Sequence, residues 1–195
     1  MRMRVLGPLA LVVVAGCTTE PLNTGDISLA QTVALTDQIV RIGLSGVASH
    51  PNAGGAGGAA IVLAPRGQVT FTLNYQQGCI EAGRIHVTGT VAGTLSDATG
   101  DGTLTVNAQE SIESCAMTTG GSRFVLNGST AITGTFVYSE GGPAADQAAR
   151  VKGDFDWTAT PGGPGRCHLD LLTSYNTATG QVAVTGQACG FNIAL

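Results

Sequence analysis

The sequence predicts an all-β domain: a single antiparallel meander that curls strongly, barrel-like or as a sandwich, with a possible short N-terminal helix. Three observations support this prediction. Apolar and polar residues alternate with a period of two over most of the chain after residue 68, as half-buried antiparallel strands require. Turn-forming residues interrupt the alternation at short intervals, which is typical of sandwiches and barrels. Glycines recur at inward positions inside the alternating stretches, where a strand bends or another layer comes close.

The first sixteen residues have the three parts of a secretory signal peptide. Arg2 and Arg4 supply the positive charge, residues 5–14 form an apolar run of about ten residues, and small residues precede Cys17. Because a membrane span needs about 20 apolar residues, this run is too short to be one. The closing residues Val-Ala-Gly-Cys17 resemble the lipobox of bacterial lipoproteins, a resemblance that covers about the first tenth of the chain. It implies cleavage before Cys17 and acylation of Cys17.

The resemblance also implies where the protein is held. Two or more acyl chains give stable anchoring, since each buried CH₂ contributes about 0.8 kcal/mol. We therefore expect a cell-envelope protein, with its domain on the periplasmic or extracellular side. Thr18, not an aspartate, follows the cysteine, which in the family favours the outer membrane in cells that have one. We expect a signal peptide over residues 1–16, a lipidated N-terminus and flexible tether over 17–27, and one β-rich domain over 28–195.

The composition of the mature chain argues against nucleic-acid binding. Without Arg2 and Arg4, seven basic residues oppose thirteen acidic ones, a net charge of about −6, and Lys152 is the only lysine. Such a chain lacks the basic patch that binds phosphate backbones or anionic headgroups. We therefore expect the membrane contact to be made by the N-terminal lipid.

Residues 28–45 form the segment for which a helix is expected. Their apolar residues have approximately helical spacing, although Asp37 interrupts the stripe and β-branched residues are frequent. We predict a helix followed by a short extended piece. The glycine- and alanine-rich residues 50–60 then predict a loop.

The strands are expected where the alternation is clearest. These stretches are residues 69–75, 85–95, 103–108, 126–138 and 151–158, followed by a hairpin of 167–171 and 182–188. Turn signals separate them at residues 96–102, 120–122, 141–144, 161–165 and 176–180. The irregular spacing of the glycine-containing pattern argues against a β-solenoid, the alternative architecture.

Cys79, Cys115, Cys167 and Cys189 are expected to form two disulfides, because an even number of cysteines in an exported domain predicts a disulfide framework. Four cysteines allow three pairings. A hairpin that turns near Gly100 would bring Cys115 opposite the start of the strand that follows Cys79, and the last hairpin is flanked by Cys167 and Cys189. We therefore predict Cys79–Cys115 and Cys167–Cys189.

The last hairpin contains a conflict. The apolar residues of its first strand, Cys167 included, have odd numbers, whereas those of its second strand have even numbers. A register that matches these apolar sets cannot place Cys167 directly opposite Cys189. We therefore expect a β-bulge near residues 186–190, or a diagonal bridge.

Two pairs of polar residues suggest hydrolysis, and each also has a simpler explanation as a solvated surface pair. His168 and Asp170 share the outward face of a strand and would need a nucleophile such as Ser174, but no Gly-x-Ser-x-Gly elbow occurs. Asp154 and Asp156 project from one face with Cβ atoms about 7 Å apart, a spacing that retaining and inverting glycosidases could both use.

No metal or cofactor is expected. The turn at residues 97–101 lacks the ligands of an EF-hand, and no Gly-Lys-Ser/Thr follows the Gly-Gly-Ala-Gly-Gly run. Zinc is disfavoured because no Cys-x-x-Cys pair occurs and His168 merely adjoins Cys167.

Three functions are compatible with these observations. The favoured one is a non-enzymatic envelope lipoprotein whose β-domain presents loops or a sheet edge to a protein, glycan or other envelope partner. The alternative is a lipocalin-like carrier of an apolar or lipid ligand, which rests on analogy of architecture. The third is a hydrolase at Asp154/Asp156 or His168/Asp170. A continuous apolar cavity above roughly 300 Å³ would favour the carrier, and a filled interior would count against it. In a carrier, small inward residues would leave the room: Gly89, Gly93, Gly128, Gly134 and Gly153.

Overall fold

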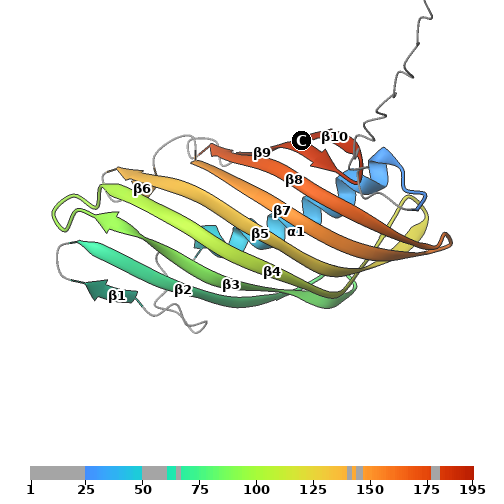
Figure 1. The fold of residues 1–195 in the computed structure, drawn as a ribbon, viewed down its shortest axis with the longest axis horizontal. Helices are drawn as coiled ribbons and strands as arrows, with labels where there is room; N and C mark the ends of the chain where they lie inside the picture. The colour runs from blue at the N-terminus through green and yellow to red at the C-terminus, as the bar shows by residue number, and fades with distance from the viewer. Residues whose placement is uncertain (1–24, 50–60, 65–66, 140–141, 144–146, 177–180) are drawn as a thin grey trace, which may run out of the picture.

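In the residues that it describes, the computed structural model shows one antiparallel sheet that curls around a single helix (Figure 1). It describes residues 25–49, 61–64, 67–139, 142–143, 147–176 and 181–195. The predicted all-β class and the strongly curled meander are confirmed, and the sheet is curled without closing. The signal peptide, Cys17 and most of the tether lie outside the described residues.

The ten strands follow one another in the sheet in the same order as along the chain, except for β6, which pairs only with β5. Their bounds are β1 Ile61–Ala64, β2 Gln68–Gly78, β3 Ala82–Leu95, β4 Gly102–Thr119, β5 Ser122–Ser139, β6 Gly142–Pro143, β7 Gln147–Thr160, β8 Pro164–Asn176, β9 Gln181–Ala188 and β10 Phe191–Ala194. Every neighbouring pair is antiparallel, as hairpin connections require.

Each long strand buries every second side chain on the inner face of the curl. In β7, for example, Val151, Phe155 and Trp157 are buried and the residues between them face solvent, apart from Gly153. Gly153 belongs to the inner face, and a Cβ atom there would overlap with the backbone of Ser129 on β5. The inward glycine therefore allows two neighbouring strands of the same sheet to approach closely, whereas a bend of the strand or the approach of another layer was expected.

The helix α1 (Leu29–Ser49) lies against the inner face and crosses the sheet. Ser28 caps it: the Ser28 hydroxyl accepts a hydrogen bond from the Gln31 N–H, and the Gln31 side chain accepts one from the Ser28 N–H. The predicted helix is confirmed, but the predicted extended piece after it is wrong, because the helix continues to Ser49. Burial of Leu35 and Ile39 against the sheet outweighs the weak helix propensity of the β-branched residues.

The structure joins Cys79 to Cys115 and Cys167 to Cys189, the two pairs that strand pairing predicted. Of the two alternatives expected at the last hairpin, the β-bulge near residues 186–190 does not occur, and the diagonal bridge is confirmed, because Cys189 falls opposite His168 and not opposite Cys167. β8 and β9 keep one register up to Leu169 opposite Ala188, and Cys189 then leaves the strand in a tight turn into β10, a strand that was not predicted. Cys189 adopts a positive φ of 49° there, and its N–H donates to the His168 carbonyl. The turn thus allows Cys189 to reach Cys167 while the odd-numbered apolar residues of β8 stay opposite the even-numbered ones of β9.

Three predicted turns, at residues 96–102, 120–122 and 161–165, connect strands as expected. Part of the turn at 141–144, nearly all of the one at 176–180 and the whole loop at 50–60 lie outside the described residues. In the part of the chain that is described, no helix combines the length and apolar character needed to cross a membrane.

Candidate functional site

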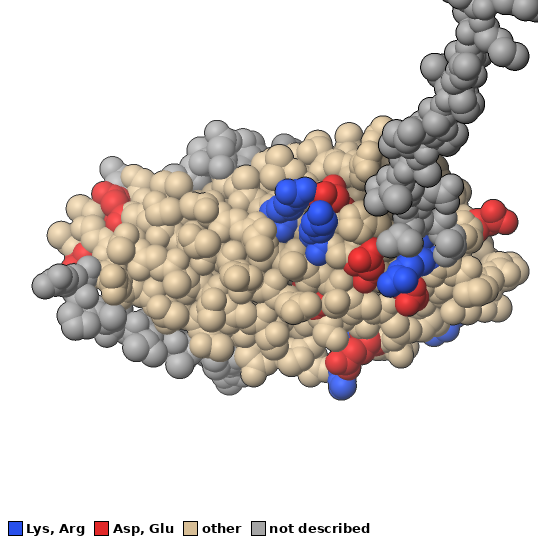
Figure 2. Space-filling model, in the orientation of Figure 1, with Lys and Arg blue, Asp and Glu red and all other residues tan. Residues whose placement is uncertain are grey.

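The charged residues of β7 and β8 gather on the outer face of the sheet. We call this set the charged cluster; it consists of Arg150, Lys152, Asp154, Asp156, Arg166, His168 and Asp170. Figure 2 shows red and blue atoms close together over these strands, whereas most of the surrounding surface in that view is uncharged. The cluster contains three cationic and three anionic side chains besides the histidine, so its charges nearly balance.

A hollow with a volume of about 370 Å³ opens within the charged cluster. Its lining includes Lys152, Asp154, Asp156 and Arg166 from the cluster, together with Gln109 and Ser129 from the neighbouring strands. The side chains around it therefore offer both hydrogen-bond donors and acceptors. This composition suits a polar ligand.

One end of the cluster is fixed by Asp170. Arg150 binds it with two hydrogen bonds, Nε to Oδ1 at 2.7 Å and Nη2 to Oδ2 at 2.6 Å, and Lys152 Nζ lies 3.7 Å from Oδ2. The hydrogen bond from Arg150 lowers the pKa of Asp170, and the same contact raises the pKa of Arg150. Asp170 is thus an ionised partner of two cations.

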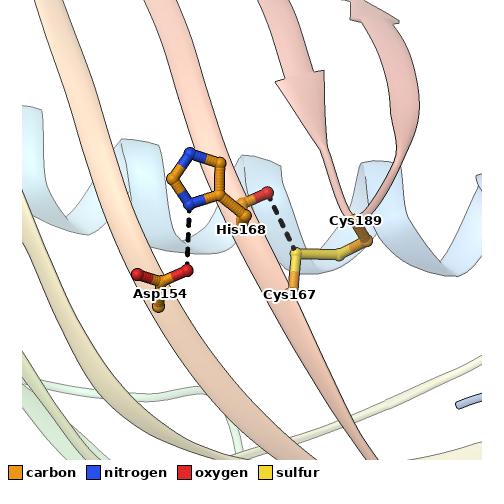
Figure 3. Close-up of a disulfide and its surroundings, with 4 residues drawn as sticks. All are labelled: Asp154, Cys167, His168 and Cys189. Carbon is orange, nitrogen blue, oxygen red and sulfur yellow. Dashed lines mark hydrogen bonds and ion pairs between the residues drawn. A yellow bond between two sulfur atoms is a disulfide. The ribbon is translucent and has the colours of Figure 1, made fainter. Parts of the chain in front are cut away.

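The expected pair of His168 with Asp170 is not formed. His168 instead pairs with Asp154 on β7, with Nδ1 2.9 Å from Oδ1 (Figure 3). The two residues are direct cross-strand neighbours, whereas Asp170 lies two residues along the same strand. The two carboxylates of the other expected pair, Asp154 and Asp156, both line the hollow, and Asp156 also lies near Arg166, with Oδ1 3.5 Å from Nε.

These residues do not form a Ser-His-Asp set. Ser129 lies opposite Asp154, and Asp154 lies opposite His168, so the carboxylate stands between the hydroxyl and the imidazole. In a catalytic triad the imidazole occupies the middle position. Ser174 is six residues from His168 along β8, roughly 20 Å at the usual strand rise.

A second polar group lies on the inner face, beneath α1. Glu110 of β4 is fully buried, and its Oε2 accepts a hydrogen bond from the Thr130 hydroxyl on β5. Its Oε1 has no hydrogen-bond partner among the described residues. Burial raises the pKa of Glu110 to about 7, and the hydrogen bond from Thr130 opposes this shift only partly.

The helix approaches this carboxyl group through a glycine. A Cβ atom on Gly43 would overlap with Glu110 Oε1, so any other residue at position 43 would displace the carboxyl group or the helix. From β2, the Tyr75 hydroxyl donates to the carbonyl of Gly43. Helix backbone and buried carboxyl group are therefore in direct contact.

Further buried polar atoms lie in the helix and near it. Thr32 and Thr36 each bury a hydroxyl, and Gln38 buries its whole amide group, without hydrogen-bond partners in the described part of the chain. Trp157 Nε1, on the sheet, is also buried without a hydrogen-bond partner among the described residues. Native proteins pair most such groups, so unpaired ones call for an explanation.

Glu110 was not identified as a buried carboxyl group in the sequence analysis, although the alternation of the strand indicates it. The even-numbered residues Leu104, Val106 and Ala108 face inward, and the same parity continues through residue 110. A glutamate that continues an apolar face is the signal of a buried carboxyl group.

No group of three or more His, Cys, Asp or Glu side chains placed to hold a metal ion occurs in the described ranges. Comparison with known proteins adds no relative: no family model, curated protein or solved structure matches this chain.

Proposed function

We propose that this chain is a lipid-anchored, non-enzymatic binding protein of the cell envelope, and that the hollow in the charged cluster holds its ligand. The observation that carries the proposal is the lining of the hollow, in which Lys152 and Arg166 face the same space as Asp154 and Asp156. Cations and carboxylates around one hollow suit a ligand that carries both signs of charge. The proposed ligand class is therefore a small zwitterionic group, free or displayed on an envelope molecule.

The arrangement of the outer face supports binding in preference to catalysis. The carboxylate of Asp154 separates His168 from Ser129, and Asp170 is held by Arg150 and Lys152. Ion pairs of this kind position a polar surface, but they provide no activated nucleophile.

The chain geometry suggests how the domain stands on the membrane. Gly25 lies against Trp157 and the backbone of Pro164, at the turn between β7 and β8. Gly25 follows Cys17 by eight positions in the sequence, a stretch that can span at most roughly 28 Å. An acylated Cys17 would therefore hold this end of the sheet near the lipid surface.

Ligand binding is tested on the mature chain with Cys17→Ser, by following NMR chemical shifts during titration with phosphoethanolamine and glycylglycine. We expect shifts centred on residues 152–156 and 166, and at least tenfold weaker binding in Lys152→Gln/Arg166→Gln. Arg84→Gln is the matched control, since Arg84 is an exposed arginine paired with Glu113 away from the hollow. Equal binding by all variants, or none by the parent chain, would refute the proposed ligand class.

Anchoring is tested in cells of the source organism or a bacterial host. Wild-type protein should incorporate labelled palmitate and sediment with membranes, because two or more acyl chains hold a protein stably. Cys17→Ser should lose the label and leave the membrane fraction, while Thr18→Ser should behave as wild type. Unlabelled wild-type protein would contradict the lipid anchor.

A carrier of an apolar ligand is the second candidate. The inner face is occupied by α1, whose Leu35 and Ile39 are fully buried against it. One observation favours a carrier: several buried polar atoms of α1 have no hydrogen-bond partner among the described residues. The helix therefore complements the apolar inner face incompletely, and an apolar ligand could take its place there. Native mass spectrometry of the purified mature chain would detect a co-purifying lipid.

A further inference from the structure

We propose that α1 is a releasable cover over the inner face of the sheet and that ionisation of Glu110 releases it. The inference goes beyond the binding function of the outer face and does not depend on it. It starts from the contact between the Glu110 carboxyl group and the helix at Gly43, where no side chain separates the two.

The neutral carboxyl group fits this position better than the carboxylate. Thr130 donates one hydrogen bond to Oε2, and Oε1 faces the helix without a partner among the described residues. A buried carboxylate with one oxygen unpaired is strongly disfavoured, whereas a neutral acid loses much less on burial. The raised pKa of Glu110, about 7, agrees with this geometry.

No described cation faces Glu110 from any element packed around it. Val87 of β3 and Thr130 of β5 are its cross-strand neighbours, and Tyr75 of β2 is a titratable residue in the same row. The charged residues of α1, Asp37 and Arg41, bind each other at 2.7 Å on the solvent side of the helix. A carboxylate at this position would therefore have no compensating charge among the described side chains.

The remainder of the helix contributes interactions that act in both directions. Leu35, Ile39 and Ile42 bury apolar side chains, which holds α1 on the sheet. Thr32, Thr36 and Gln38 act in the opposite direction, since their polar atoms recover hydrogen bonds to water when the helix leaves. The first turn contains no acidic residue and the last turn no basic one, so the helix dipole is not compensated either.

Release would uncover the apolar inner face. At low pH the neutral Glu110 keeps α1 in place; above the range in which the carboxyl group ionises, solvation of the carboxylate favours the open state. The residues then exposed lie on the strands that contact α1 and include Ile85, Val87, Leu104, Val106 and Ile132, which are fully or almost fully buried in the closed state.

The test is hydrogen exchange of the full mature chain, measured by NMR or mass spectrometry between pH 5.5 and 8.5 and corrected for intrinsic exchange rates. With the pKa of Glu110 moving from 4.5 in the open state to about 7 in the closed one, protection of α1 amides should fall about 30-fold over this range. Protection in β4 and β5 should exceed that of α1 at every pH, because these strands exchange only through global unfolding.

Glu110→Gln keeps the shape of the neutral acid and should abolish the pH dependence in α1. Glu113→Gln is the matched control: it alters an exposed, ion-paired glutamate on the same strand and should preserve the pH dependence. Thr130→Val is a second variant, which should enlarge the fall by removing the hydrogen bond that favours the carboxylate.

Three results would overturn the proposal. The first is α1 protection that does not change with pH in the wild type. The second is an unchanged pH dependence in Glu110→Gln or, should that variant not fold, no enlargement in Thr130→Val. The third is α1 protection equal to that of the central strands at every pH, which would mean that α1 exchanges only through global unfolding and not through release of the helix.

Discussion

The free energy of unfolding should fall by about 3 kcal/mol as the pH rises from about 4.5 to 8, and Glu110→Gln should remove this fall. In the unfolded chain a glutamate has its ordinary pKa of 4.5, whereas in the folded protein burial keeps Glu110 protonated up to about pH 7. Between these values the folded state binds one more proton than the unfolded state. Stability therefore decreases with rising pH, by about 1.4 kcal/mol per unit.

Urea denaturation followed by the fluorescence of Trp157, which is buried in the folded protein, measures this dependence. The useful range is pH 5 to 8, because Asp170 has a lowered pKa and loses its stabilising interaction with Arg150 only at lower pH. Glu113→Gln should retain the wild-type slope. A wild-type stability that stays constant or rises over this range would contradict a Glu110 carboxyl group that stays protonated up to about pH 7 in the folded state.

Much of the sheet could be predicted because its sequence alternates cleanly. The pairing of Cys79 with Cys115 follows from extending one hairpin register, and the structure keeps that pairing even though an irregularity in β4 precedes Cys115. The strand β10 was missed because it has four residues and follows a turn at Cys189, where the alternation ends. Such short elements are set by tertiary contacts more than by local pattern.

The candidate sites were harder to predict because they depend on register. His168 and Asp170 look like partners in the sequence, but residues two apart on a strand lie about 7 Å from each other, whereas cross-strand neighbours lie about 5 Å apart. His168 therefore pairs with its cross-strand neighbour Asp154 and not with Asp170. Glu110 was missed for another reason. A charged residue at an inward position normally indicates that the buried part of a strand has ended, so the predicted strand stopped at residue 108. Only the position of α1 shows that the carboxyl group of Glu110 is buried.

Removing the Cys167–Cys189 disulfide should cost about 3–4 kcal/mol of unfolding free energy, a large fraction of the 5–15 kcal/mol typical of a domain. The two cysteines are 22 residues apart in sequence, and their bond restricts the unfolded chain across the whole of the β8–β9 hairpin. In the folded state the same bond ties the turn before β10 to β8. We therefore expect Cys167→Ala/Cys189→Ala to expose this edge of the sheet as well as to lower global stability.

The comparison that isolates this effect is Cys79→Ala/Cys115→Ala, which opens a longer loop of 36 residues at the other disulfide. Loop entropy alone predicts a slightly larger loss for that variant. Hydrogen exchange at residues 191–195 should accelerate only when Cys167–Cys189 is removed, because β10 is an edge strand paired with β9 alone. Equal exchange of these amides in both double variants would mean that β9–β10 pairing, and not the disulfide, holds the C-terminal edge in place.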